Sequence, residues 1–113
     1  MSAITTHVLD TSLGKPAAGV AVTLEAHSGE GWKTLASGTT DADGRVRDLL
    51  PEGSAIAPGT FRLRFDTAAY FRARGVETFY PQVEIVFTVK DPAQHTHVPL
   101  LLSPFGYSTY RGS

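Results

Sequence analysis

The chain ends in HVPLLLSPFGYSTYRGS, residues 97–113, an apolar segment at a place where chains are usually polar and poorly ordered. Val98, Leu100 and Leu102 alternate with the residues between them, which predicts a strand with one face in a core. The SPFG that follows is typical of a turn, and residues 107–111 predict a second strand rich in aromatic and hydroxyl side chains. The chain is therefore expected to end inside its fold, against strands from elsewhere in the sequence.

Further strands are expected upstream, because short β-branched or alternating segments recur at spacings of about ten residues. They cover residues 4–9, 20–27, 32–40, 61–65 and 83–89, with a short further segment at 45–50. Residues 66–75 predict the one helix, since an N-cap candidate comes first, alanines follow, and arginines and a glycine come last. Seven to eight strands with short turns and one short helix predict an all-β fold, an antiparallel β-sandwich.

The composition restricts the class of protein. The 113 residues suit a single domain, 1–113, and show no internal repeat or linker. A net charge of −1 favours neither nucleic acid nor an anionic membrane as a partner, and the absence of cysteine excludes disulfides and thiolate zinc sites. The first residues carry neither a basic region nor an apolar run, and no segment approaches the roughly 18 apolar residues of a membrane helix. A cytoplasmic protein is therefore expected.

Four histidines are the natural candidates for proton transfer near neutral pH. His95 and His97 are two residues apart on one predicted strand, so both project from the same face. That face lies opposite the apolar one, which places His97 on the outside of its sheet if the apolar residues fill the core. Taken alone, an H-x-H pair is typical of a wet or interfacial strand, and together with His7 it could also form an open zinc site.

The remaining large and charged side chains are expected to be structural. Arg45 follows an Asp-Gly turn, which on its own is typical of a solvated strand start. Aromatic side chains are expected in the core and most arginines on solvated faces. The core candidates are Trp32, Phe61, Phe65 and Phe87, and the solvated arginines are Arg62, Arg64, Arg72 and Arg74. The sequence contains no glycine-rich phosphate loop, no pair of catalytic carboxylates and no G-x-S-x-G motif.

Three segments indicate a protein family more specifically in combination than each does alone. They are THVLD at residues 6–10, the turn at Gly44 and Arg45, and HTHVPLLLSPFGYSTYRGS at residues 95–113. In this combination the chain resembles the transthyretin-like 5-hydroxyisourate hydrolases over essentially its whole length. The pattern of the first half is shared with transthyretin, whereas the terminal YRGS is the mark that separates the hydrolases from the hormone carrier.

The resemblance implies a transthyretin-like β-sandwich that hydrolyses a cyclic amide. The expected reaction opens 5-hydroxyisourate, a product of urate oxidation in purine catabolism, to 2-oxo-4-hydroxy-4-carboxy-5-ureidoimidazoline. It also implies that the enzyme needs no metal or organic cofactor. The expected assembly is a homotetramer, with sites in a channel between dimers that is lined by the outer sheet faces.

The same resemblance implies the roles of five residues. It makes His7, Arg45, His97 and Ser113 catalytic, and it makes His7, Arg45 and Tyr110 substrate-binding. A neutral imidazole can take a proton from water, and the forked donors of an arginine suit a developing oxyanion. The tyrosine offers a hydroxyl and a ring face, and the last residue offers a hydroxyl and the terminal carboxylate. Which histidine is the general base stays open, as does whether Ser113 acts chemically or structurally.

The alternative is a non-enzymatic β-sandwich that binds a small ligand, as transthyretin does. It explains the predicted fold and the early G-K-P and D-G patterns equally well. It does not explain why two histidines, an arginine and the YRGS terminus occur together. An accessory or adhesion module leaves the same combination unexplained, and the hydrolase interpretation is therefore favoured.

Overall fold

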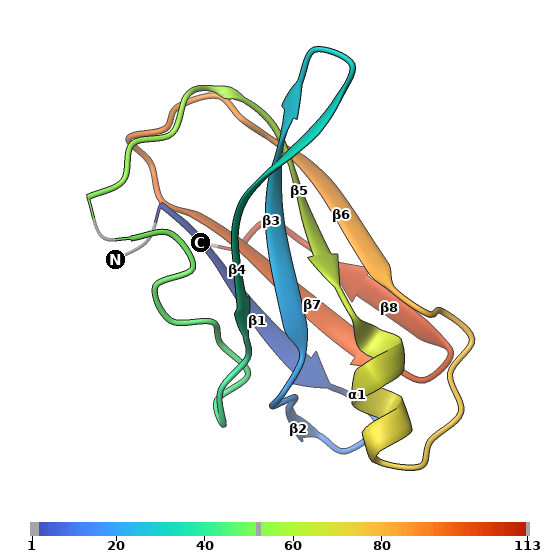
Figure 1. Cartoon of the computed structure of the whole chain (residues 1–113). Coiled ribbons are helices and arrows are strands. Elements are labelled where there is room, and N and C mark those ends of the chain that lie inside the picture. Colours follow the sequence, from blue (N-terminus) through green and yellow to red (C-terminus); the bar gives the residue numbers. More distant parts are fainter. Residues whose placement is uncertain (1–2, 52, 113) are drawn as a thin grey trace.

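Two four-stranded sheets pack face to face in the computed structural model, which describes residues 3–51 and 53–112 (Figure 1). Sheet A has the order β2-β1-β7-β8 and sheet B the order β4-β3-β5-β6. The strands of sheet A are β1 (Ile4–Asp10), β2 (Lys15–Pro16), β7 (Thr96–Ser103) and β8 (Gly106–Thr109). Those of sheet B are β3 (Ala21–Ser28), β4 (Gly31–Thr39), β5 (Gly59–Phe65) and β6 (Val83–Val89). The predicted all-β sandwich is confirmed.

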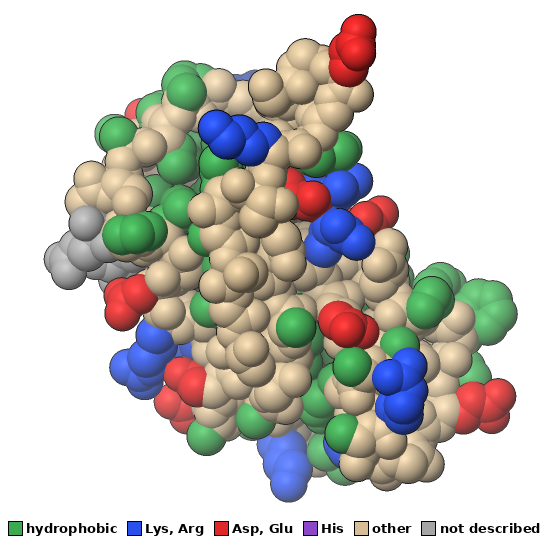
Figure 2. Space-filling model, in the orientation of Figure 1, with side chains coloured by type: hydrophobic (Ala, Val, Ile, Leu, Met, Phe, Trp, Pro, Cys, Tyr) green, Lys and Arg blue, Asp and Glu red, His purple; other side chains and the backbone are tan. Residues whose placement is uncertain are grey.

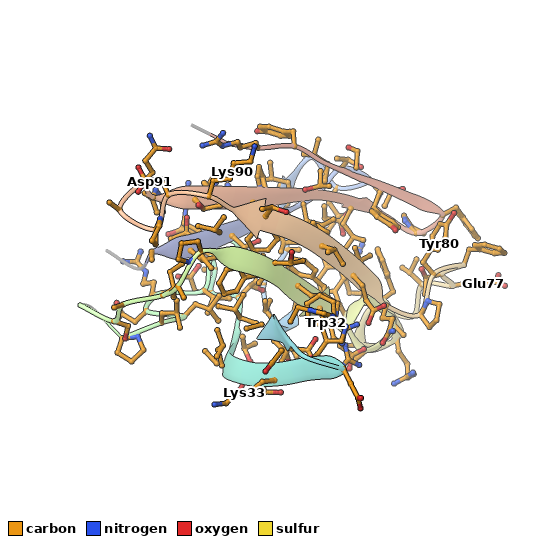
Figure 3. The ribbon with its side chains drawn as sticks, turned by 90° about the horizontal axis from the view of Figure 1, so that it is seen from above. Trp32, Lys33, Glu77, Tyr80, Lys90 and Asp91 are labelled. Atoms are coloured by element: carbon orange, nitrogen blue, oxygen red, sulfur yellow. The ribbon has the colours of Figure 1, made fainter. Side chains whose placement is uncertain are left out.

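The predicted short helix is α1 (Thr67–Ala73), between β5 and β6. Asp66 caps it, because its side chain accepts a hydrogen bond from the backbone N–H of Ala69 at 3.2 Å. Figure 3, which views the sandwich from above, shows the two layers edge-on, with Tyr80 at one end and Lys90 at the other. No helix within the described residues is long and apolar enough to cross a membrane.

The strand pairing differs from the prediction in two places. The β1–β7 pair is parallel, whereas the other strand pairs are antiparallel. The chain completes sheet B before it returns to sheet A, where β7 lies beside β1 and runs in the same direction. The segment 45–50 is not a strand, because only Arg45 forms a bridge to sheet A and Asp48 turns the chain with a φ of 56°.

Alternation in β1 and β7 separates the core from the outside of sheet A. Val98, Leu100 and Leu102 of β7 are buried, as predicted, and lie in one hydrophobic cluster with residues of sheet B. Each such side chain contributes roughly 1.5–3 kcal/mol of burial free energy. In β1 the even-numbered residues are buried, and Thr5 and His7 occupy the opposite face. His7 and His97 therefore lie on the outer face of sheet A, which does not contribute to the core.

Three expectations about side chains were wrong. Trp32 lies outside the core on sheet B, where the guanidinium of Arg62 covers its ring at 4.4 Å (Figure 3). Arg62 is not solvated, since it pairs with the buried carboxylate of Glu25 at 2.7 Å. Arg74 is exposed, as predicted, and also binds the fully buried Asp10 at 2.8 Å. Phe87 is only partly buried, whereas Phe61 and Phe65 lie in the core as predicted.

Asp10, the last residue of the THVLD segment, joins α1 to the end of β1. Its carboxylate accepts hydrogen bonds from the Tyr70 hydroxyl at 2.7 Å, from Arg74 at 2.8 Å and from the Ser12 hydroxyl at 2.5 Å. Burial opposes ionisation, but hydrogen bonds from the hydroxyls of Ser12 and Tyr70 and from the backbone N–H groups of Leu13 and Ser12 hold the pKa of Asp10 below its usual value. Burial and the neighbouring carboxylate raise the pKa of Tyr70 to about 12. This network fixes the helix against sheet A.

Candidate functional site

The parallel register of β1 and β7 brings a threonine between two histidines. Thr5 is the partner of His97 in this register, so their side chains lie together on the outer face of sheet A. The Thr5 hydroxyl oxygen lies 2.7 Å from Nδ1 of His97 and 2.8 Å from Nε2 of His95. The two imidazole rings are stacked with centroids 6.3 Å apart. His95 and His97 therefore share a face, as the H-x-H spacing predicts.

The Asp-Gly turn places Arg45 beside β1. The backbone N–H of Val8 donates to the carbonyl of Gly44 at 2.7 Å, and Arg45 forms an isolated bridge with His7. Gly44 has a φ of 77°, and a Cβ there would collide with the Val8 carbonyl and lie 3.2 Å from Cδ2 of His7. Only glycine allows this close approach. The turn therefore holds Arg45 next to a strand that is distant in sequence.

An aspartate at the start of the turn fixes its geometry. The carboxylate of Asp41 accepts hydrogen bonds from the backbone N–H groups of Asp43 at 2.9 Å and of Arg45 at 3.1 Å. The side chain of Arg47 binds the same carboxylate at 3.0 Å. Arg45 itself is exposed, and no carboxylate of residues 3–51 or 53–112 pairs with its guanidinium. Its donors therefore remain free of any described ion pair.

The end of the chain returns to His97. The backbone N–H of Gly112 donates to the His97 carbonyl at 2.9 Å, and the two residues form an antiparallel bridge. A Cβ on Gly112 would lie 2.5 Å from Cδ2 of His97, so a larger residue would push the ring. Ser113 lies outside the described residues. The terminal segment thus packs directly against one of the predicted catalytic histidines.

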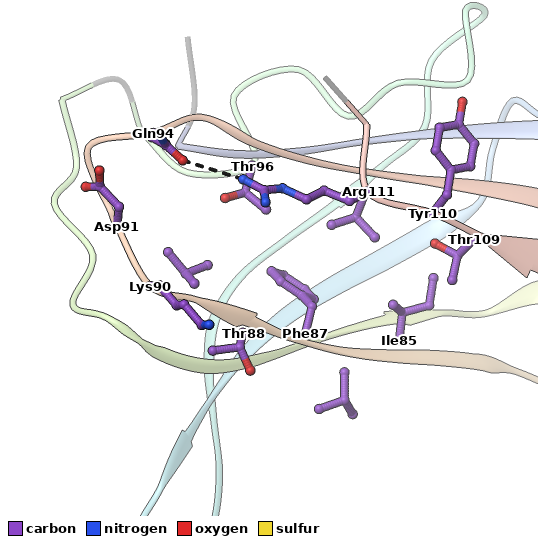
Figure 4. A pocket seen from close by; sticks show the side chains of 13 residues that line it. Ile85, Phe87, Thr88, Lys90, Asp91, Gln94, Thr96, Thr109, Tyr110 and Arg111 are labelled. Carbon is purple, nitrogen blue, oxygen red and sulfur yellow. Dashed lines mark hydrogen bonds between the residues drawn. The ribbon is translucent and has the colours of Figure 1, made fainter.

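Tyr110 has a different environment from the histidines. Its side chain is 58% exposed and lines a pocket of about 490 Å³ between β6 and the C-terminal segment (Figure 4). Arg111 lines the same pocket, where it donates a hydrogen bond to Gln94 at 3.5 Å. None of the predicted catalytic residues within the described chain is part of this lining. The structure brings His7, Arg45 and His97 together and leaves Tyr110 in this separate pocket.

Burial and positive neighbours keep His97 neutral. Its ring is half-buried, and this burial lowers its pKa from the ordinary value of 6.5. The charges of Arg45, His95 and His7 lower the pKa of His97 further, against a weaker opposing effect from a backbone hydrogen bond to Thr5. A histidine with a lowered pKa is unprotonated at neutral pH and can accept a proton. The site therefore combines a neutral base with a nearby cation.

The zinc interpretation of the histidines finds no support. Within the described residues, no group of three or more histidine, aspartate or glutamate side chains is arranged to hold a metal ion. Residues that the prediction did not include complete the cluster instead. Thr5 shares a face with His7 in the sequence pattern, but its contact with His97 depends on the parallel register. Gly112 could have been suspected because it lies within the YRGS motif.

Known proteins are similar to this chain in sequence and in their two-sheet fold. A family model described as the HIUase/Transthyretin family matches residues 4–112. The chain belongs to this family. It is 50% identical over 114 residues to the 5-hydroxyisourate hydrolase of Mus musculus, covering 99% of this chain and 96% of that protein.

Solved structures from both branches of the family superpose on the chain. Sea bream transthyretin in complex with thyroxine is similar with a TM-score of 0.91 and 34% identity, over 98% of this chain and 95% of that one. The 5-hydroxyisourate hydrolase of Klebsiella pneumoniae gives a TM-score of 0.84 and 36% identity, over 97% and 98% of the two chains. The backbone fold is thus common to a transthyretin in complex with thyroxine and to a 5-hydroxyisourate hydrolase.

Proposed function

We propose that this chain is a 5-hydroxyisourate hydrolase of purine catabolism that forms 2-oxo-4-hydroxy-4-carboxy-5-ureidoimidazoline. The observation that carries the proposal is the meeting of His7, Arg45 and His97 on the outer face of sheet A, against the terminal segment. The hydrolases of Mus musculus and Klebsiella pneumoniae support it, because the likeness extends over nearly the whole of each chain.

His97 is the proposed general base. Its lowered pKa favours the neutral imidazole, which takes a proton from water as the water attacks the ring carbonyl. Arg45 is charged at any working pH and donates to the oxyanion that develops, which is typically worth roughly 3 kcal/mol in the transition state. His7 lies beside Arg45 on β1 and is proposed to bind the substrate next to the reacting amide. No metal or organic cofactor is required by this chemistry.

Ser113 is proposed to complete the site through a terminal hydroxyl or carboxylate, and Tyr110 is proposed to offer its ring face to the flat substrate from the neighbouring pocket that it lines. A homotetramer is the proposed assembly. It is supported by large apolar side chains that are exposed in the single chain, among them Phe79 at 70% and Phe105 at 65%. The last strands of the two sheets, β6 and β8, also present free edges for pairing. Light scattering coupled to size-exclusion chromatography measures this assembly directly.

The decisive experiment follows the ultraviolet absorbance of freshly generated 5-hydroxyisourate with and without the protein. The proposal expects decay to be accelerated in proportion to protein concentration, and the His97→Ala variant to remove most of the acceleration. Undiminished turnover by this variant would contradict the role of His97. Absence of acceleration by the wild-type protein would favour the transthyretin-like small-ligand carrier, which the TM-score of 0.91 to sea bream transthyretin keeps as the second candidate.

A further inference from the structure

The hydroxyl of Thr5 contacts both imidazoles of the H-x-H pair. Its oxygen lies 2.7 Å from Nδ1 of His97 and 2.8 Å from Nε2 of His95. A threonine hydroxyl has one proton to donate and two lone pairs that accept. If Thr5 donates to one ring, the other ring must therefore donate its N–H to Thr5. The protonation of the two histidines is coupled through this hydroxyl.

Two arrangements follow from this coupling. In the first, Nδ1 of His97 donates to Thr5, Thr5 donates to Nε2 of His95, and Nε2 of His97 keeps a free lone pair. In the second, Nε2 of His95 donates to Thr5, Thr5 donates to Nδ1 of His97, and Nε2 of His97 carries the proton. His97 is a base in the first arrangement and an acid in the second.

The surroundings of the two rings differ in how well they tolerate a positive charge. His97 is half-buried, with Thr5 and His7 facing it from β1, Arg45 from the turn, His95 from its own strand and the backbone of Gly112 from the tail. None of these described groups is a carboxylate. His95 is exposed, so its ring can exchange a proton with solvent. A proton taken up at His97 can therefore leave the half-buried position through His95.

We propose that Thr5 and His95 form a proton relay that allows His97 to act first as base and then as acid without retaining positive charge beside Arg45. This inference rests on the proposed hydrolase function and adds two positioning residues to it. As water attacks, one of its O–H bonds breaks and its proton bonds to Nε2 of His97. The Nδ1 proton of His97 passes to the Thr5 oxygen, the Thr5 proton passes to Nε2 of His95, and Nδ1 of His95 releases its proton to solvent.

The same path runs backwards when the C–N bond of the ring breaks. Nε2 of His97 gives its proton to the leaving nitrogen, and Nδ1 of His97 receives the Thr5 proton. Thr5 takes the Nε2 proton of His95, whose Nδ1 is reprotonated from solvent. One water molecule has then been added across the amide bond, and the relay has returned to its first arrangement with no net gain or loss of protons.

Variants that keep or remove the relay separate it from a structural contact. Thr5→Val removes the hydroxyl at nearly constant volume, and we expect kcat to fall about 10–100-fold with little change in KM. Thr5→Ser keeps the hydroxyl and should restore most of this loss. His95→Gln retains a hydrogen-bonding amide but cannot pass a proton, so it should lose as much kcat as Thr5→Val. The double variant should be no worse than either single one, because both interrupt one path.

His27 provides the matched control, since it is an exposed histidine on sheet B. His27→Gln should leave kcat and KM unchanged. Wild-type kcat in His95→Gln would overturn the relay, whatever the activity of Thr5→Val. His95 is exposed, so His95→Gln tests the proposal even if Thr5→Val fails to fold.

A second measurement does not depend on activity. In ligand-free protein with ¹⁵N-labelled histidine, the ring nitrogens of His95 and His97 should titrate as one coupled pair in the wild type. In Thr5→Val they should titrate independently, with His27 unchanged as the reference. Identical titrations of both proteins would overturn the relay. Failure of the wild-type protein to accelerate 5-hydroxyisourate decay would instead overturn the proposed function, while this titration still decides whether Thr5 couples the histidines.

Discussion

The outer faces of the two sheets differ in whether their charged side chains form ion pairs. On sheet B, Glu25 pairs with Arg62 at 2.7 Å and with Arg64 at 3.6 Å, and Glu84 pairs with Arg64 at 3.3 Å. Figure 2 shows acidic and basic side chains next to one another on this face. On the outer face of sheet A, the described residues place Arg45 among histidines without a carboxylate partner.

This difference has opposite effects on the protonation of the two faces. The hydrogen bond from Arg62 lowers the pKa of Glu25, and the same bond raises the pKa of Arg62, so both stay charged and satisfied. Burial and positive neighbours lower the pKa of His97, so that a base is kept neutral beside a cation. Removing one partner of a covered ion pair is costly because the other charge is left buried, whereas unpaired groups with shifted pKa values are typical of functional sites.

The largest expected effect is the loss of activity in Arg45→Ala. If the unpaired guanidinium stabilises the oxyanion, kcat/KM should fall about 10²–10³-fold, while the urea-unfolding midpoint stays close to that of the wild type. Arg72→Ala is the matched control, because Arg72 is an exposed arginine on α1 and should affect neither quantity. Near-wild-type turnover by Arg45→Ala would contradict a catalytic role for the unpaired arginine on the outer face of sheet A.

The second prediction is a loss of stability without a loss of activity. Glu25→Gln removes the nearer charge partner of Arg62, whose side chain is largely covered, and leaves Glu84 at 3.7 Å, so it should lower the free energy of unfolding by about 3 kcal/mol. Glu84→Gln is the control, since Glu84 is more exposed and should change stability by about 0–1 kcal/mol. Urea denaturation measures both variants, and a large loss of kcat in Glu25→Gln would contradict the separation of the two faces.

The pH dependence of stability has a definite sign for the same carboxylate. The native pKa of Glu25 is lower than its ordinary 4.5, so its stabilisation is fully present above about pH 4.5 and is lost as the pH falls through the native value. Glu25→Gln should therefore flatten the fall of the urea midpoint below that pH. An unchanged slope would show that the pairing does not contribute.

Local patterns predicted the elements and the side of each sheet that faces the core. The two-residue period of β7 placed Val98 in the core and His97 outside, and the structure confirms both. The H-x-H spacing likewise predicted the shared face of His95 and His97. These predictions succeeded because side-chain direction along a strand depends only on neighbours in sequence.

Contacts between distant segments could not be predicted in the same way. The position of Thr5 against His97 depends on the parallel pairing of β1 with β7, which no local pattern specifies. The burial of Asp10 depends on donors from Tyr70 and Arg74, and the ion pair of Glu25 depends on the antiparallel register of β3 with β5, which places Glu25 opposite Arg62. These contacts depend on tertiary structure, so they could be identified only from the folded chain.

A smaller expected effect concerns the contact between the tail and His97. In Gly112→Ala the new Cβ would lie 2.5 Å from Cδ2 of His97, so the ring must move and kcat should fall about 10-fold. Gly106→Ala is the matched control on β8, because its Cβ would meet only the Ser103 hydroxyl at 3.7 Å. The proposed role of the tail would be contradicted if both variants had the same kcat as the wild type.

The smallest expected effect is a change in the pH at which His97 titrates. Because burial and then the charge of Arg45 lower its pKa, the acid limb of kcat/KM should lie below pH 6.5. Arg45→Gln removes one of these positive neighbours, so the pKa of His97 in the ligand-free protein should rise, as histidine NMR can measure. His27, on the outer side of sheet B, should titrate identically in both proteins. A pKa of His97 that stays the same in Arg45→Gln would mean that the charge of Arg45 does not reach the proposed base, and burial alone would then keep the imidazole neutral.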